Sequence, residues 1–305
     1  MASFFRANSL RASSLELLEK YRNDLPEHEI EMLLESAYVS EFPSQPRPTR
    51  ADLHGLGRDL AVGRWTLQAE TWIEQRIRNQ TPVQHLTRES HFYGRSFEVG
   101  PEALIPRPET EILVHEVLRE LKTGDDRTLR GAEVGLGSGV ISLTLLAELG
   151  PKLQMVATEV EEGASELAKR NAQRLGVSSR LEGVLVADSP RARAQAQVLE
   201  PLVGYGPFDF LVSNPPYLVA GSDEAQVEVV RSEPHRALFA PPGDPLYFYR
   251  EIASGAVNLL RPKGMIALEI PHERSQEIEQ LFRAERVTIR QDLSGRDRVL
   301  VAFLK

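Results

Sequence analysis

The pattern of apolar and polar positions changes about halfway along the chain. From Ala132 onward, short apolar runs of strand length alternate with longer stretches whose apolar residues recur at helical spacing. This alternation predicts an α/β fold in which helices cover a mostly parallel sheet. Strands are expected at residues 132–134, 153–158, 181–186, 208–212 and 265–270.

Helices are expected between these strands, at residues 140–149, 162–175, 246–260 and 273–284. The last two apolar runs, residues 287–290 and 298–303, lie on either side of a turn signal at Ser294-Gly295. We expect them to pair in antiparallel fashion at one side of the sheet. Residues 217–243 form a long polar connection that is a candidate lid or substrate loop.

The first 80 or so residues show helical spacing and no strand pattern. A capping box, Ser13-x-x-Glu16, precedes the first apolar face, and Trp65 and Trp72 fall on another and are interpreted as core residues. Residues 1–86 therefore predict a small helical domain. Residues 87–105 carry Gly94 between two alternating runs and predict a β-hairpin linker, so residues 106–305 form the α/β domain.

Composition narrows the classes of function. The chain of 305 residues has no cysteine, which excludes disulfides, thiolate metal sites and cysteine nucleophiles, and no metal site is predicted. Its net charge of −8 disfavours a broad nucleic-acid surface. No apolar run is long enough to span a membrane and no signal peptide is apparent, so a cytoplasmic location is expected.

A glycine-rich turn, Gly135-Leu136-Gly137-Ser138-Gly139, lies between the first expected strand of the α/β domain and the following helix. Glycines there let the backbone approach a ligand closely. Glu159 follows about twenty positions later at the end of the next strand, where a carboxylate accepts hydrogen bonds from ribose hydroxyls. The glycine spacing differs from the dinucleotide G-x-G-x-x-G pattern and suits a nucleoside cofactor such as S-adenosylmethionine better.

Two further segments are candidates for the wall of the cofactor pocket. Asp188 and Ser189 follow the third strand, where Asp188 either bonds an adenine amino group or serves a turn. Pro106 and Arg107 belong to a stiff lead-in, Ile105-Pro106-Arg107-Pro108-Glu109-Thr110, which either lines the pocket or simply starts a helix.

The stretch with the most specific chemistry is Asn214-Pro215-Pro216-Tyr217, directly after the apolar strand at residues 208–212. Two prolines stiffen the loop and leave its carbonyls without local N–H partners. Asn214 Oδ1 and the Pro215 carbonyl could each accept one hydrogen of a planar NH2 group, with Tyr217 against its flat face. The alternative is a rigid turn without a catalytic role.

Together these residues resemble the protein-(glutamine-N5) methyltransferases that modify peptide chain release factors. The resemblance covers nearly the full length and includes Phe92-Tyr93-Gly94, the Ile105 to Thr110 stretch, Asn214-Pro215-Pro216-Tyr217 and Glu233-Pro234. The Asn-Pro-Pro-Tyr loop also occurs in adenine-N6 DNA and guanine-N2 RNA methyltransferases, whereas the Ile-Pro-Arg-Pro-Glu-Thr stretch is typical of the glutamine enzymes.

The resemblance implies a class I S-adenosylmethionine-dependent methyltransferase, with a Rossmann-like seven-stranded sheet whose last strand is antiparallel. The helical domain would bind the substrate, a class I release factor, at the glutamine of its Gly-Gly-Gln motif. Asn214, Pro215, Pro216 and Tyr217 would form the catalytic loop. Cofactor-binding residues would be Gly135 to Gly139, Glu159, Asp188, Ser189, Asn214, Pro106 and Arg107. The expected product is S-adenosylhomocysteine, and the expected state is a monomer.

Three alternatives stay open. The substrate could be a ribosomal-protein glutamine, because that enzyme shares nearly every motif. It could be an amino group of DNA or RNA, although the net charge argues against direct nucleic-acid binding. The chain could also bind the cofactor and a partner without catalysis.

Overall fold

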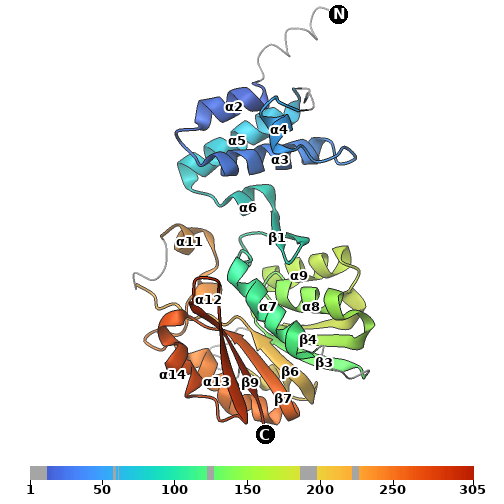
Figure 1. The fold of residues 1–305 in the computed structure, drawn as a ribbon, viewed down its shortest axis with the longest axis vertical. Coiled ribbons are helices and arrows are strands. Elements are labelled where there is room, and N and C mark those ends of the chain that lie inside the picture. The colour runs from blue at the N-terminus through green and yellow to red at the C-terminus, as the bar shows by residue number, and fades with distance from the viewer. Residues whose placement is uncertain (1–11, 58–59, 61, 122–126, 186–197, 222–226) are drawn as a thin grey trace, which may run out of the picture. The chain divides into compact units, whose positions relative to one another are not determined.

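The protein divides into two compact units, with the boundary between Glu89 and Ser90 (Figure 1). The computed structural model describes residues 12–57, 60, 62–121, 127–185, 198–221 and 227–305. Each unit has its own apolar core.

The first unit is helical, as its sequence pattern predicts. Its core includes Leu17, Leu33 and Trp65, with Trp72 packed against it, so both tryptophans serve packing. The expected capping box is present, with Ser13 and Glu16 bonded reciprocally. The helices are α2 (Ser14–Tyr21), α3 (Glu27–Glu41), α4 (Arg50–Leu53), α5 (Arg64–Asn79) and α6 (Val83–Thr87).

A two-stranded hairpin follows α6. Strands β1 (Glu89–Phe92) and β2 (Arg95–Glu98) meet at Tyr93 and Gly94, both at positive φ. Phe92 and Phe97 pack edge to face and belong to the core of the second unit. The hairpin is therefore held by the α/β unit through its own apolar side chains.

The second unit contains a seven-stranded sheet in the order β5-β4-β3-β6-β7-β9-β8. Only β9, the last strand, runs antiparallel to its neighbours, which confirms the predicted fold. The strands are β3 (Leu129–Val134), β4 (Leu153–Glu159), β5 (Leu181–Leu185), β6 (Phe208–Ser213), β7 (Leu260–Glu269), β8 (Arg286–Gln291) and β9 (Asp297–Phe303).

Helices cover both faces of this sheet, and the side chains of β6 show why. Phe210 and Val212 point into a core shared with α7 (Pro108–Leu121) and α8 (Val140–Leu149). Leu211 points to the opposite core, shared with α13 (Tyr247–Gly255) and α14 (Ser275–Glu279). Helix α9 (Glu162–Arg174) adds Ala172 to the first core. Figure 1 shows α9 next to α8. Strand β6 is thus buried on both faces, which explains why most of its side chains are apolar. Its one charged residue, Asp209, is paired with Arg127 and Arg261.

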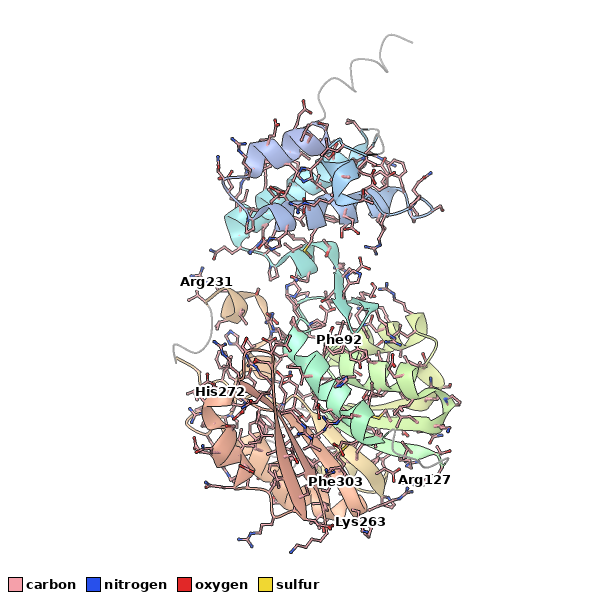
Figure 2. All side chains as sticks on the ribbon, viewed as in Figure 1. Phe92, Arg127, Arg231, Lys263, His272 and Phe303 are labelled. Carbon is pink, nitrogen blue, oxygen red and sulfur yellow. The ribbon has the colours of Figure 1, made fainter. Side chains whose placement is uncertain are left out.

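The strand order places a functional edge on the sheet. The chain runs outward from β3 to β5 and then returns to the other side of β3 with β6, so the order reverses between β3 and β6. Ligands of open α/β sheets bind beyond the carboxyl ends of strands at such a reversal. Figure 2 shows the two ends of the unit, with Arg127 and Lys263 near the amino ends of β3 and β7 and His272 beyond the carboxyl end of β7.

Two helices expected in the carboxyl half are shorter than predicted, and the polar connection contains helices that were not predicted. The helix expected at 246–260 ends at Gly255, because Leu260 already pairs with Phe208 in the sheet. The helix expected at 273–284 shortens to α14, since the chain must turn to enter β8 at Arg286. The polar connection at 217–243 contains two short helices, α11 (Val227–Ser232) and α12 (His235–Leu238).

Within the described ranges, none of the helices combines the length and the apolar character that crossing a bilayer requires.

Candidate functional site

The Asn-Pro-Pro-Tyr loop and the glycine turn leave the sheet side by side. Val134 and Ser213, the last residues of β3 and β6, are register partners. The Ser213 hydroxyl donates to the Val134 carbonyl at 2.7 Å, in a fully buried position. The two segments that the sequence singles out therefore begin from adjacent strand ends.

The glycine turn provides an open backbone surface. Gly135, Gly137 and Gly139 have φ of +79°, +55° and +86°, a region that residues with a Cβ rarely adopt. A Cβ at Gly135 or Gly137 would meet no atom within 4 Å, whereas one at Gly139 would strike Leu143. The first two glycines thus leave room for a ligand, and the third serves close packing of α8.

The other two residues of the turn support it from inside the protein. The Leu136 side chain is buried against Ala157 and Ala168, so only its backbone can face a ligand. Ser138 is also buried, and its carbonyl accepts a hydrogen bond from Asn171 Nδ2 at 2.9 Å. Asn171 was not foreseen from the sequence, and it ties the turn to the backbone of Glu98 in β2.

Glu159 ends β4 beside the turn, as predicted. Its Oε2 accepts from the Gly137 N–H at 2.7 Å, and its Oε1 accepts from the N–H groups of Val160 and Glu161. A carboxylate oxygen has two lone pairs, so Oε2 retains one acceptor site in addition to its bond to the turn. This geometry suits an acceptor for a ribose hydroxyl.

Glu133, at the penultimate position of β3, is a carboxylate to which the sequence pattern assigned no role. Its Oε2 accepts from the backbone N–H and the hydroxyl of Ser142 in the first turn of α8. Its Oε1 is buried and has no hydrogen-bond partner among the described residues. Burial, with a smaller contribution from the charge of Glu159, raises the pKa of Glu133 to about 8.

The Asn214 side chain is bonded to Thr110, which is bonded in turn to Glu269, and both residues lie far from Asn214 in the sequence. Its Nδ2 donates to Thr110 Oγ1 at 3.3 Å, and Thr110 Oγ1 donates to Glu269 Oε2 at 2.7 Å. Thr110 lies in the first turn of α7, and Glu269 ends β7 next to β6. No described residue donates a hydrogen bond to Asn214 Oδ1, so the structure leaves that acceptor available.

The rest of the loop is stiff and well packed. Pro215 is buried, and Pro216 and Tyr217 are partly buried. The Tyr217 ring packs against the core that contains Tyr249. Burial raises the pKa of Tyr217 to about 12, so its hydroxyl stays protonated. Within the described part of the chain no backbone N–H bonds the Pro215 carbonyl.

The Ile105 to Thr110 stretch is fixed by Glu233. The buried Glu233 side chain accepts from the Ile105 N–H at 2.9 Å and forms an ion pair with Arg107. Pro106 is partly buried between them. The Arg107 guanidinium is therefore paired with a protein carboxylate. Glu233-Pro234, which the sequence analysis named only as part of the family resemblance, connects the Ile105 to Thr110 stretch to the segment after Tyr217.

The remaining predicted site residues, Asp188 and Ser189, lie outside the described residues. The supporting residues that sequence reasoning missed are Thr110, Glu133, Asn171 and Glu269. Thr110, Glu133 and Glu269 are polar residues within apolar or motif-bearing stretches, and that is the signal that could have marked them, because a polar side chain that folding buries needs a partner. Asn171 lies in a mostly polar segment of α9 and carries no such signal.

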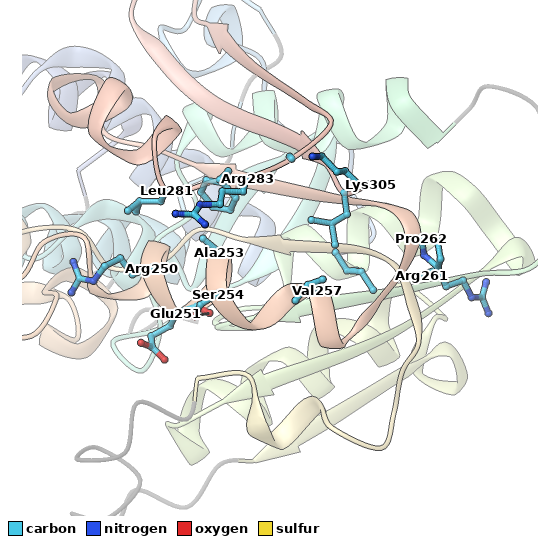
Figure 3. Close-up of a pocket in the computed structure, with 14 residues that line it drawn as sticks. Arg250, Glu251, Ala253, Ser254, Val257, Arg261, Pro262, Leu281, Arg283 and Lys305 are labelled. Carbon is cyan, nitrogen blue, oxygen red and sulfur yellow. Dashed lines mark hydrogen bonds between the residues drawn. The ribbon is translucent and has the colours of Figure 1, made fainter.

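Two other features lie apart from this site. A hollow of about 870 Å³ opens between α13, the start of β7 and the chain end, where Arg250, Arg261 and Lys305 surround apolar residues (Figure 3). The hollow lies at the amino end of β7, which begins at Leu260, and near the end of β9, where Phe303 pairs with Met265. Asn214 lies at the other end of the strands, because it follows the carboxyl end of β6 and β6 is parallel to β7.

In the first unit, Glu27, Glu31 and His54 come within 4.8 Å of one another, as metal ligands do. Both carboxylates already pair with Arg50, which makes this an ordinary ion-pair group.

Comparison with known proteins decides the family. No family model matches the chain. It is 37% identical over 226 residues to the release factor glutamine methyltransferase of Moorella thermoacetica, covering 73% of this chain and 75% of that protein. It is 32% identical over 253 residues to the enzyme of the same name from Bacteroides thetaiotaomicron, covering 81% and 84%. The chain belongs to the release factor glutamine methyltransferase family.

A structural neighbour agrees with the fold. The delta-N METTL16 MTase domain superposes with a TM-score of 0.50 at 21% identity, covering 78% of this chain and 95% of that domain. At that identity the likeness concerns the fold alone. It confirms the methyltransferase fold expected from the sequence, and the family membership confirms the resemblance carried by the Ile105 to Thr110 and Asn214 to Tyr217 stretches.

Proposed function

We propose that this protein transfers a methyl group from S-adenosylmethionine to the side-chain amide nitrogen of the glutamine in the Gly-Gly-Gln motif of class I release factors. The observation that carries the proposal is the pair of acceptors beside the glycine turn. Asn214 Oδ1 and the Pro215 carbonyl both lack described donors and follow the strand next to β3. They match the two hydrogens of a planar NH2 group.

The residues around the turn fit S-adenosylmethionine. The open surface over Gly135 and Gly137 accepts the body of the nucleoside, and Glu159 Oε2 has an acceptor site for a ribose hydroxyl. The unpartnered Glu133 Oε1 is a candidate acceptor for an ammonium group, whose positive charge would favour the ionised carboxylate over the protonated form that burial favours in its absence. Asp188 and Ser189 remain proposed residues of the adenine wall. When bound, the cofactor supplies an electrophilic methyl group and leaves as S-adenosylhomocysteine.

The protein's own contribution is to make a poor nucleophile reactive. The nitrogen of an amide is weakly nucleophilic because its lone pair is delocalised into the carbonyl. Asn214 Oδ1 and the Pro215 carbonyl would each accept one N–H, fixing the nitrogen with its lone pair toward the methyl group. The same acceptors stabilise the positive charge that develops on nitrogen during transfer. The methylated nitrogen, which carries two protons and a positive charge, would then release one proton to solvent. Tyr217 would pack against the amide plane.

Release factors are favoured over the alternatives by the relatives' names. The two relatives described above, at 37% and 32% identity, are both named for release factors. A ribosomal-protein glutamine remains the rival substrate for the same chemistry. The helical domain predicted at residues 1–86 is the proposed surface for the protein substrate. The proposed enzyme acts as a monomer and does not bind nucleic acid.

The proposal is tested by product mapping. The protein is incubated with isotopically labelled S-adenosylmethionine and a purified class I release factor, and the methylated residue is located by mass spectrometry. The expected result is one methyl group on the glutamine of Gly-Gly-Gln, absent when that glutamine is changed to Asn. Label found instead on ribosomal protein or nucleic acid, with none on release factor, would contradict the proposal.

A further inference from the structure

We propose that Thr110 and Glu269 are positioning residues that fix the orientation of the Asn214 amide, so that its oxygen and not its NH2 group faces the substrate. The inference rests on the proposed function and concerns how the same site is kept in order. Asn214, Thr110 and Glu269 come from β6's end, α7 and β7, so three elements converge on one amide.

The direction of the hydrogen bonds follows from the donor and acceptor inventory. An ionised carboxylate only accepts, so Thr110 must donate its single hydroxyl proton to Glu269 Oε2, 2.7 Å away. The Thr110 oxygen is then left with lone pairs only. It can bond an Asn214 NH2 at 3.3 Å, but it would repel Asn214 Oδ1 in the same place.

We call the two hydrogen bonds from Asn214 to Thr110 and from Thr110 to Glu269 the relay. The relay matters because the oxygen and the NH2 group of an asparagine amide are nearly identical in shape. Without a partner that distinguishes them, the side chain can rotate by half a turn and present NH2 to the substrate. Two NH2 groups facing each other share no acceptor, and the substrate amide would not be held. The orientation of Asn214 therefore decides whether the loop offers two acceptors or one.

Burial gives the relay its stiffness. Thr110 and Glu269 are 3% and 5% exposed, so water competes poorly for their hydrogen bonds. The Glu269 carbonyl also accepts from the Tyr249 hydroxyl at 3.0 Å, which anchors the end of β7. Holding the Asn214 amide in one orientation thus has two requirements. Position 110 must carry a hydroxyl, and position 269 must carry a group that can only accept a hydrogen bond.

Substitutions at Thr110 test the first requirement. Thr110→Val keeps the shape and removes the hydroxyl, and should lower kcat about tenfold, as expected for the loss of one hydrogen bond of about 1.4 kcal/mol. Its affinity for S-adenosylmethionine should stay within about twofold of the parent, since the glycine turn and Glu159 are unchanged. Thr110→Ser restores the hydroxyl and should recover most of kcat.

The matched control is Thr144→Val. Thr144 is fully buried in α8 and its hydroxyl has no hydrogen-bond partner among the described residues, so the same chemical change is made away from the relay. Its kcat should equal that of the parent. A Thr110→Val enzyme with the parental kcat, or a Thr110→Ser enzyme as slow as Thr110→Val, would overturn the proposal.

Glu269→Gln tests the second requirement. A glutamine NH2 can donate to Thr110, which frees the Thr110 hydroxyl to donate to Asn214 Oδ1 and reverses the relay. We expect kcat to fall about tenfold, for loss of the same hydrogen-bond energy. Glu116→Gln, a buried carboxylate in α7 that pairs with Arg119 and Arg290, is the control and should retain activity.

The pH profile gives a readout that a purely structural role would not change. In the parent, kcat should rise through the pKa of Glu269, which burial raises to about 7, and Glu269→Gln should lack that step. The charged and titratable groups that act on Glu269 are kept in both proteins: Glu109, Arg107, Arg298, Tyr217 and Tyr249.

A structural measurement separates this proposal from the proposed function. In ¹⁵N-labelled protein, the Asn214 NH2 resonances, assigned by their loss in Asn214→Ala, should exchange slowly with solvent in the parent and rapidly in Thr110→Val. If the parent does not methylate release factor, the function fails while this readout still tests the relay. Equal exchange in parent and variant would overturn the relay alone.

Discussion

The Ser213 hydroxyl donates a hydrogen bond to the Val134 carbonyl at 2.7 Å, and these two residues are the last of their strands. One bond thus joins the starting points of the glycine turn and the Asn-Pro-Pro-Tyr loop. A nitrogen held by the loop and a methyl group carried over the turn must meet within a bond-forming distance, so the relative placement of β3 and β6 is part of the proposed chemistry.

Ser213→Ala tests this connection. The change removes a fully buried hydroxyl and leaves the Val134 carbonyl with one bond fewer, which should lower the free energy of unfolding by about 1–2 kcal/mol. Urea denaturation followed by circular dichroism measures the loss. Ser254→Ala, which removes an exposed hydroxyl within α13, is the control and should change stability by less than about 0.5 kcal/mol.

Gly137→Ala should weaken cofactor binding more than it weakens the fold. The residue has φ of +55°, so alanine costs about 1–2 kcal/mol in backbone strain, and its methyl group enters the open space over the turn. We expect affinity for S-adenosylmethionine, measured by isothermal titration calorimetry, to fall at least about tenfold.

Gly176→Ala separates strain from obstruction. Gly176 has φ of +67° and equally open surroundings, but it follows the end of α9 away from the site. Its substitution should lower the free energy of unfolding by about the same 1–2 kcal/mol and leave cofactor affinity unchanged. Equal losses of affinity in both alanine variants would show that the turn is not the cofactor surface.

The ion pair behind the Ile105 to Thr110 stretch should contribute measurably to stability. Glu233→Gln keeps an acceptor for the Ile105 N–H but removes the charge that pairs with Arg107, and should cost about 1.5–3 kcal/mol. Glu148→Gln disrupts the more exposed pair with Arg95 and should cost at most about 1 kcal/mol. Chemical denaturation of the two variants gives the comparison, and a Glu233→Gln cost as small as that of Glu148→Gln would contradict it.

Two buried carboxyl groups should make the fold less stable as pH rises. Burial raises the pKa of Glu133 to about 8 and that of Glu269 to about 7, from an ordinary value near 4.5. Between pH 5 and 8 the folded protein therefore binds more protons than the unfolded chain, and the free energy of unfolding falls with rising pH. Glu133→Gln should flatten this dependence, whereas Glu273→Gln, at an exposed position, should leave it unchanged.

Much of the fold was predictable because it follows from local patterns. The mostly apolar run of β6, interrupted only by Asp209 before its final Ser213, predicts a strand covered on both faces. The turn at Ser294-Gly295 predicts the terminal antiparallel pair. The ends of α13 and α14 were not predictable, because residues such as Leu260 have helical spacing in sequence but are drawn into the sheet by pairing with Phe208.

The site shows the same division. The glycine turn, Glu159 and Asn214 are recognisable in short segments of sequence. The sequence alone therefore predicted that they lie at the carboxyl ends of neighbouring strands, where the structure has them. Thr110, which bonds Asn214, lies 104 residues before it in the chain, and Glu269, which bonds Thr110, lies 159 residues after Thr110. No local sequence pattern links positions this far apart. Asp188 and Ser189 lie outside the described residues and stay predictions.

Asn214→Ala is the variant that tests the central idea most directly. With purified release factor as substrate, kcat should fall about a hundredfold to a thousandfold, as for the loss of one group that stabilises charge in a transition state. Calorimetry should show that affinity for S-adenosylmethionine falls far less than kcat, because Asn214 is only one of several proposed cofactor contacts. A variant that methylates the release factor at the parental rate would contradict the account.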